Sequence, residues 1–160
     1  MQVDTVETFV EKHKPKLFGY LLRMTGDYEH ASDIMQESFT RYLEHYADQA
    51  PSAALLYTIA RNVLFDRSRS RIRLVELDEH ADQGGFHPEH ELLVKEEYRA
   101  FLKAFQRLSE DERNILSLAV STQMSYREIG EVVAMSESNV KVKIHRARQK
   151  LREILKGGVQ

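Results

Sequence analysis

The residues best suited to chemistry in this sequence are the basic and polar side chains between residues 137 and 156. This stretch holds seven Lys and Arg against two Glu, a local charge of +5. Lys and Arg bind phosphates, and Asn, Gln, His and Arg can hydrogen-bond to the edges of bases. Arranged as a helix, the stretch therefore presents a surface suited to nucleic acid. The residues that we predict to contact DNA are Asn139, Lys141, Val142, Lys143, His145, Arg146 and Gln149.

The elements around this stretch predict a helix-turn-helix. Ser125 and Glu128 form an S-x-x-E capping box, and Ser136 is a second N-cap candidate eleven residues later. This spacing leaves room for a first helix over about Tyr126 to Val133 and a short turn. An apolar stripe on the second helix should pack on the helices before it; its members are Val140, Ile144, Ala147, Leu151 and Ile154. A basic run alone would favour an ordinary solvated helix, but the two caps and the stripe together favour a helix laid in the major groove.

A second basic helix is predicted over residues 57–71, where Arg and Asn alternate with aromatic residues. Arginines can hold a nucleic-acid backbone, and aromatic rings can stack on unpaired bases. The alternative is that Tyr57 and Phe65 are core residues and that the arginines form a solvated face. The candidates for nucleic-acid contact are Tyr57, Arg61, Asn62, Arg67, Arg69 and Arg71.

The charge distribution reconciles these basic surfaces with a net charge of −2 over 160 residues. Residues 61–73 carry a local charge of +4, whereas residues 74–97 carry −7 and residues 27–48 carry −5. Screening limits electrostatic attraction to roughly 10 Å at ordinary salt, so phosphate binding depends on the local patch and not on the total charge.

The composition restricts the class of protein further. There is no Cys, which excludes a disulfide framework and fits a reducing cytosol. No apolar run approaches the length of a membrane span, and the acidic, polar N-terminus does not resemble a signal peptide. We therefore expect a cytoplasmic protein without membrane insertion.

The hydrophobic periodicity predicts an all-α fold. Apolar residues recur at helical spacing over about 5–24, 28–46 and 53–71, and again from residue 92 onward. Between them lies an acidic segment that contains a Gly pair and a Pro and has no sustained period. We predict two small helical domains, residues 1–73 and 92–160, joined by a flexible acidic linker at 74–91, with the helix-turn-helix in the second domain.

Three blocks of the sequence resemble the extracytoplasmic-function (ECF) sigma factors of bacterial RNA polymerase. Residues 27–39 are similar to the family's D-x-x-x-A-x-D-I-x-Q-E-x-F signature, and residues 59–66 to its I-A-R-N-x-x-x-D signature. The third block is the helix-turn-helix that ends in Arg146-Ala-Arg148. All three occur in the family's order over nearly the whole chain.

The resemblance implies a function for each part. The N-terminal domain would recognise and help melt the −10 promoter element, with Asn62 near the non-template strand and the loop 48–51 capturing a flipped base. Residues Asp33, Gln36 and Glu37 would contact the clamp helices of the polymerase β′ subunit. The C-terminal domain would read the −35 element and approach the β flap. Core RNA polymerase, promoter DNA and an anti-sigma factor are thus the expected partners.

The sequence departs from the family's usual pattern at two positions. Gly130 stands where the family usually has Ala, at a cost of roughly 1 kcal/mol inside a helix but with room for close helix approach. Val142 replaces a small hydroxyl residue; it could touch a thymine methyl group but cannot hydrogen-bond. The helix is still expected to dock in the major groove, but the exact −35 sequence that it reads does not follow from the family's usual pattern.

Other site types are weaker candidates. His80, His87 and His90 have short spacing, but no further ligands on rigid elements accompany them, so we expect no metal and no cofactor. No phosphate-binding loop, dinucleotide motif or nucleophile elbow occurs, and we expect no enzyme activity. Two alternatives to a sigma factor stay open at this point: a repressor or activator that binds duplex DNA with the C-terminal domain alone, and an adaptor protein without a DNA role.

Overall fold

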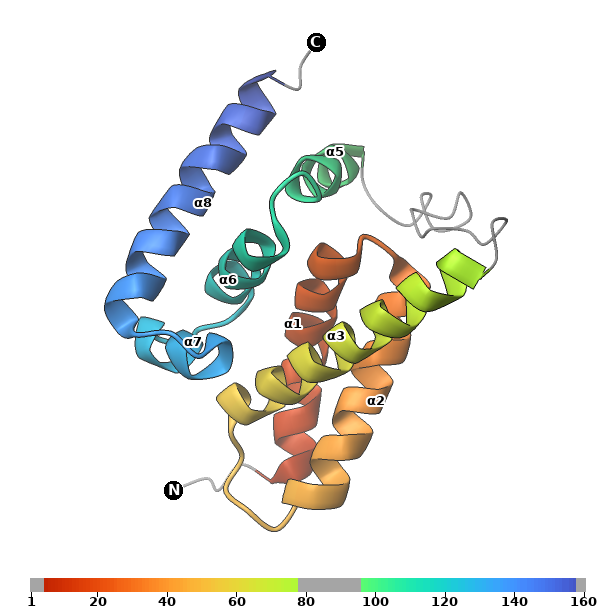
Figure 1. The fold of residues 1–160 in the computed structure, drawn as a ribbon. Helices are drawn as coiled ribbons and strands as arrows, with labels where there is room; N and C mark the ends of the chain where they lie inside the picture. Colours follow the sequence, from red (N-terminus) through yellow and green to blue (C-terminus); the bar gives the residue numbers. More distant parts are fainter. Residues whose placement is uncertain (1–4, 78–95, 158–160) are drawn as a thin grey trace.

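The structure, a computed structural model, describes residues 5–77 and 96–157, the side chains of residues 70–77 and 121 excepted. Within these ranges the chain is built of α-helices without strands (Figure 1). The helices are α1 (Val6–Thr25), α2 (Tyr28–Tyr46), α3 (Ala53–Leu77), α5 (Glu96–Phe105), α6 (Glu110–Ser121), α7 (Tyr126–Val133) and α8 (Glu137–Gly157). The predicted all-α class is confirmed.

Helices α1, α2 and α3 form an N-terminal unit in which α2 packs against both of its neighbours. Helix α1 ends at Thr25, and the left-handed conformation of the next residue, Gly26 (φ 68°), reverses the chain. Asp27 then caps α2 by accepting a hydrogen bond from the backbone N–H of His30 at 3.2 Å. Glycine is suited to this turn because it adopts a positive φ without steric cost.

Helices α5 to α8 form a C-terminal unit in which α8 packs against α5, α6 and α7. Helices α6 and α7 both begin with a capping box, Ser109 with Glu112 and Ser125 with Glu128. Each box satisfies two backbone N–H groups that a helix start would otherwise leave unpaired. The capping box predicted at Ser125 and Glu128 is confirmed, as are the predicted bounds of α7.

The two units pack against each other, α1 on α6 and α3 on α7 (Figure 1). At this junction the Tyr20 hydroxyl donates a hydrogen bond to Asn114 Oδ1 at 2.5 Å, and both side chains are buried. Gln106 Nε2 donates to the backbone carbonyl of Arg23 at 2.7 Å. The sequence alone does not predict this docking, because Tyr20 and Asn114 are 94 residues apart.

The third helix is longer than expected. We predicted a helix over 53–71 and a linker from residue 74, whereas α3 continues to Leu77. No Gly or Pro interrupts residues 72–77, so nothing local ends the helix there. Residues 78–91 of the predicted linker lie outside the described residues, as do His80, His87 and His90.

Candidate nucleic-acid interface

Helix α8 separates its side chains into two faces as predicted. Val140, Ile144, Ala147 and Leu151 are buried, and this stripe holds the helix against the rest of the C-terminal unit. All seven predicted DNA-contact residues are exposed: Asn139, Lys141, Val142, Lys143, His145, Arg146 and Gln149. The helix therefore presents a basic and polar surface to solvent over about three turns.

The turn between α7 and α8 depends on two unusual backbone positions. The backbone N–H of Met135 donates to the carbonyl of Gly130 at 2.9 Å, and a Cβ atom on Gly130 would lie 2.5 Å from the Met135 carbonyl oxygen. Ala134 occupies the left-handed region with φ 58°. The close approach at Gly130 is therefore to the backbone of the turn that follows α7, whereas the sequence predicted an approach between helices.

The start of α8 is capped as predicted, since Ser136 Oγ accepts a hydrogen bond from the backbone N–H of Asn139 at 3.2 Å. Farther along α8, Lys150 Nζ pairs with Glu112 Oε1 at 3.0 Å. Partial burial opposes ionisation of Glu112, but hydrogen bonds from Ser109 and Lys150 outweigh it and lower the pKa of this carboxyl group below its usual value. Glu112 therefore stabilises the start of α6 and its contact with α8 together.

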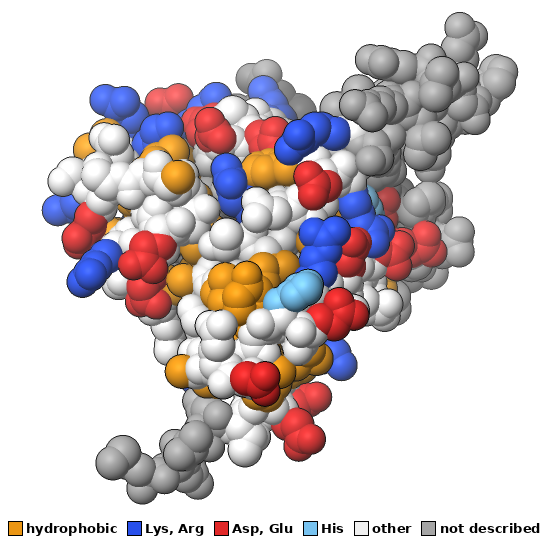
Figure 2. All heavy atoms as spheres, turned by 60° about the horizontal axis from the view of Figure 1, so that its bottom comes forward, with side chains coloured by type: hydrophobic (Ala, Val, Ile, Leu, Met, Phe, Trp, Pro, Cys, Tyr) orange, Lys and Arg blue, Asp and Glu red, His pale blue; other side chains and the backbone are white. Residues whose placement is uncertain are grey.

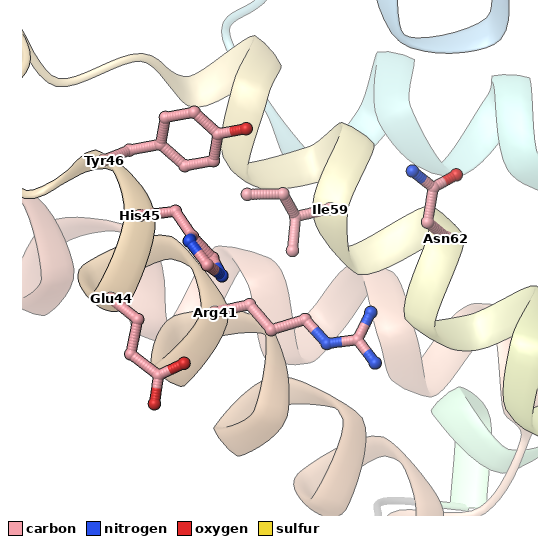
Figure 3. Close-up of a pocket in the computed structure, with 6 residues that line it drawn as sticks. All are labelled: Arg41, Glu44, His45, Tyr46, Ile59 and Asn62. Carbon is pink, nitrogen blue, oxygen red and sulfur yellow. The ribbon is translucent and has the colours of Figure 1, made fainter.

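In the N-terminal unit, Asn62 is exposed on α3 and borders a hollow of about 450 Å³. The other residues around the hollow come from the C-terminal half of α2 and from α3 (Figure 3): Arg41, Glu44, His45, Tyr46 and Ile59. A cation, a histidine, an aromatic ring and an amide thus surround one open space. Groups of these kinds can stack on a base and hydrogen-bond to its edges.

The hollow lies near the connection from α2 to α3, and Figure 1 shows this connection at the lower end of the molecule. When this end is turned forward, hydrophobic side chains and a histidine lie beside both basic and acidic side chains (Figure 2). Residues 48–51 of the connection are exposed. The connection is held by the backbone N–H of Ser52, which donates to the Tyr42 hydroxyl at 3.1 Å, and by Ser52 Oγ, which accepts from the Leu55 N–H.

Tyr57 does not belong to the exposed surface. Its side chain is fully buried and packs edge-on against Tyr20 with 5.4 Å between the ring centroids. The ring is therefore not accessible to a base in this structure, and the alternative of a core role is the one that the structure shows. Burial also raises the pKa of the Tyr57 hydroxyl, which stays protonated.

The predicted arginines of α3 differ in their surroundings. Arg61 is half-buried, and its guanidinium carbon lies 4.6 Å from the centre of the Phe65 ring, a cation–π contact. Arg67 is bound to Glu37, and Arg69 is exposed with Asp66 at 3.6 Å. The side chain of Arg71 lies outside the described residues. Only Asn62 and Arg69 among the described candidates of this helix are exposed.

The three residues expected to contact polymerase differ in their exposure to solvent. Asp33 and Gln36 are exposed on α2. Glu37 is half-buried and accepts hydrogen bonds from Arg41 and Arg67. These bonds lower the pKa of Glu37 below its usual value, the bond from Arg67 contributing most. Glu37 is therefore engaged within the N-terminal unit.

Of the six residues around the hollow, only Asn62 is predicted from the sequence; the other five are Arg41, Glu44, His45, Tyr46 and Ile59. The spacing of four between Arg41 and His45 places them on one side of α2, which was a usable signal. Their meeting with Asn62 depends on how α2 crosses α3, which the helical period does not reveal.

Comparison with known proteins identifies the family. The family described as Sigma-70 region 2 matches residues 9–73, and the family described as Sigma-70 region 4 matches residues 98–151. The ECF RNA polymerase sigma factor SigL of Mycobacterium tuberculosis is 32% identical over 152 residues, covering 89% of this chain and 84% of the relative. The chain belongs to the ECF sigma factors. The ECF sigma factor SigM of Bacillus subtilis is 27% identical and covers 97% of this chain and 98% of its own.

Solved structures share the fold of this sigma factor. The sigma factor RpoE of Bartonella quintana, in complex with the anti-sigma factor NepR, superposes with a TM-score of 0.77 at 23% identity and covers 94% of this chain and 98% of its own. CnrH, in complex with the cytosolic domain of CnrY, gives a TM-score of 0.64 at 20% identity, covering 94% of this chain and 89% of its own. At these identities the likeness concerns the fold.

Membership in the family establishes the general function. The protein is an ECF-type sigma factor that directs promoter-specific transcription by RNA polymerase, and the family is one of initiation factors and not of known catalysts. Among the described residues, no helix combines the length and apolar character that a bilayer span requires. The same residues contain no group of three or more His, Asp or Glu arranged to hold a metal ion.

Proposed function

We propose that this sigma factor reads promoters at two elements, the −35 element with α8 and the −10 element with the surface formed by α2 and α3. The arrangement of α8 carries the first half of the proposal. Its apolar stripe is buried, while Lys141, Val142 and Arg146 are exposed together on the opposite side. A helix held in this way can enter the major groove and place these side chains against bases and phosphates.

The hollow beside Asn62 supports the second half. Its volume of about 450 Å³ and its lining of Arg41, His45 and Tyr46 suit a single unpaired base. Unstacking a base from a duplex costs a few kcal/mol, which the protein must return through stacking and hydrogen bonds. Arg69 on α3 and the exposed loop 48–51 would contact the adjoining strand. Tyr57 is left out of this surface because it is buried.

Two classes of protein partner complete the proposal. Asp33 and Gln36, exposed on α2, would contact the clamp helices of the polymerase β′ subunit, and the C-terminal unit would approach the β flap. The two structural neighbours are described as complexes with the anti-sigma factor NepR and with the cytosolic domain of CnrY. We extend the first of these relationships to this chain and propose that an anti-sigma factor binds it. We expect promoter binding to be weak in the free protein and strong in the holoenzyme.

Run-off transcription with purified core polymerase tests the proposal. The Lys141→Ala/Arg146→Ala variant should lower promoter-specific transcription at least about tenfold, because it removes contacts each worth on the order of 1 kcal/mol or more. Arg152→Ala/Lys156→Ala is the matched control: it also removes two exposed positive charges from the same helix, outside the seven residues predicted to contact DNA. This variant should retain near-normal transcription.

Two outcomes would contradict the proposal. Equal loss in both variants would mean that α8 supplies only a diffuse positive charge. Tight, sequence-specific binding by the free protein, unchanged by core polymerase, would instead favour a regulator that acts on duplex DNA alone.

A further inference from the structure

The carboxylate of Glu37 joins two arginines from different helices. Its Oε1 accepts a hydrogen bond from Arg41 Nη2 at 2.8 Å within α2, and its Oε2 accepts from Arg67 Nε at 2.8 Å and from Arg67 Nη2 on α3. Both oxygens are thus occupied by guanidinium groups, a strong and directional form of pairing. Glu37 therefore links α2 to α3, because it accepts hydrogen bonds from an arginine of each helix.

One of these two arginines belongs to the hollow described above. Arg41 extends from α2 toward α3, with its guanidinium group on the side of Asn62 (Figure 3). The bond to Glu37 restricts the rotamers of this long side chain, which would otherwise be free in solvent. Glu37 itself is about one-third exposed and is not among the residues around the hollow.

This pairing engages Glu37 within the N-terminal unit in the free protein. Each carboxylate oxygen of Glu37 accepts at least one bond from an arginine, so a polymerase contact by Glu37 would share these oxygens with the two guanidinium groups. Asp33 and Gln36 lie on the same helix and are exposed, so they can supply such a contact without Glu37. The lowered pKa of Glu37 fits this arrangement, since the arginines favour its charged form.

We propose that Glu37 is a positioning residue of the −10 surface, which holds Arg41 toward an unpaired nucleotide in the hollow and Arg67 toward the phosphates of the same strand. The inference rests on the proposed −10 role. Arg41 is thereby assigned as a further specificity-determining residue, because a fixed guanidinium group can select a base edge that a mobile one cannot. Loss of Glu37 should lower discrimination between sequences more than it lowers affinity for nucleic acid in general.

The test uses reconstituted holoenzyme and two labelled single-stranded oligonucleotides, one with the non-template −10 sequence of a promoter that the wild type transcribes and one with that sequence scrambled. The ratio of their dissociation constants measures discrimination. Glu37→Gln should lower this ratio about tenfold, as expected for the loss of a charge-assisted hydrogen bond, while core polymerase binding stays within about twofold of wild type. Arg41→Ala should lower it similarly, and the Glu37→Gln/Arg41→Ala double variant should lose less than the product of the two single losses.

Two control variants sharpen the result. Glu44→Gln removes the same charge from the lining of the hollow without touching an arginine pair, and should keep the ratio. Asp33→Asn should weaken core binding and leave the ratio of the assembled complex unchanged.

Failure takes two distinguishable forms. Weakened core binding by Glu37→Gln with an unchanged ratio would overturn the inference alone, as would fully multiplicative losses in the double variant. A wild-type holoenzyme that does not discriminate between the two oligonucleotides would overturn the proposed −10 role itself.

Discussion

The hydroxyl of Tyr20 on α1 and the side-chain oxygen of Asn114 on α6 share a buried hydrogen bond of 2.5 Å that joins the two helical units. Burial raises the pKa of the Tyr20 hydroxyl above its usual value, so this group remains a donor over the whole physiological range. Tyr20→Phe should lower the free energy of unfolding by about 1–2 kcal/mol, because it leaves Asn114 buried without its donor. Urea denaturation measures this loss.

The companion variant Tyr20→Phe/Asn114→Leu removes both polar partners. It should recover part of the lost stability, since no unpaired polar group stays buried. A double variant that is less stable than the sum of the two single effects would show that the hydrogen bond is not the main interaction at this position.

A side chain at Gly130 should destabilise the protein. A Cβ atom there would lie 2.5 Å from the backbone oxygen of Met135, too close for any real contact. Gly130→Ala should therefore cost about 1–3 kcal/mol despite the better helix propensity of Ala. Thermal unfolding checks this expectation, and an unchanged or raised melting temperature would refute it.

Ala134 is a position at which glycine should stabilise the protein. Its φ of 58° is unfavourable for a residue with a Cβ atom, and it is the position after a helix that glycine commonly occupies. Ala134→Gly should stabilise the protein by about 0.5–1 kcal/mol, the relief of strain exceeding the greater entropy of glycine in the unfolded chain. The same unfolding assay applies, with Ala119→Gly inside α6 as a control that should destabilise.

Val142 should affect promoter choice without affecting folding. Its side chain is 46% exposed on α8, so Val142→Ala should leave thermal stability nearly unchanged. If Val142 touches a thymine methyl group, the variant should lose up to about tenfold in affinity for promoters with that thymine, and little for others. Selection of −35 sequences from a randomised pool by each holoenzyme would reveal the change; identical selected sequences would exclude a base contact.

Glu112 should make stability depend on pH in the acidic range. Its pKa in the folded protein is lowered, so its contribution is fully present above the unfolded value of about 4.3 and is lost as the pH falls through the folded pKa. Glu112→Gln keeps an oxygen for the capping box but loses the charge that pairs with Lys150. Because the pair is partly solvent-exposed, the variant should lose no more than about 1 kcal/mol at pH 7. The difference should disappear at low pH, and a difference that persists there would point to packing instead.

The local features of this fold could be predicted from the sequence. Ser109, Ser125 and Ser136 each predict a helix start because capping depends only on residues within one turn. The exposed face of α8 also follows from the spacing of Val140 and Ile144, since a helix with one buried stripe must present the opposite side to solvent.

The contacts between distant segments could not be predicted in the same way. The sequence predicts outside partners for Glu37 and for Arg67, whereas the structure pairs the two residues with each other. The sequence around Tyr57 fits a residue that stacks on a base as well as it fits a core residue. Only the packing of α3 against α1 shows that Tyr57 belongs to the core. The acidic composition from residue 74 predicts a linker, whereas α3 continues to Leu77, because acidic residues such as Glu do not by themselves end a helix.

The docking of α1 on α6 and of α3 on α7 has a thermodynamic consequence. A molecule that binds both units across this junction binds only the conformation in which the two units are in contact. Any ligand that requires the units apart must then compete with that molecule even without sharing a single contact residue. By reciprocity, each weakens the other's binding by the same factor.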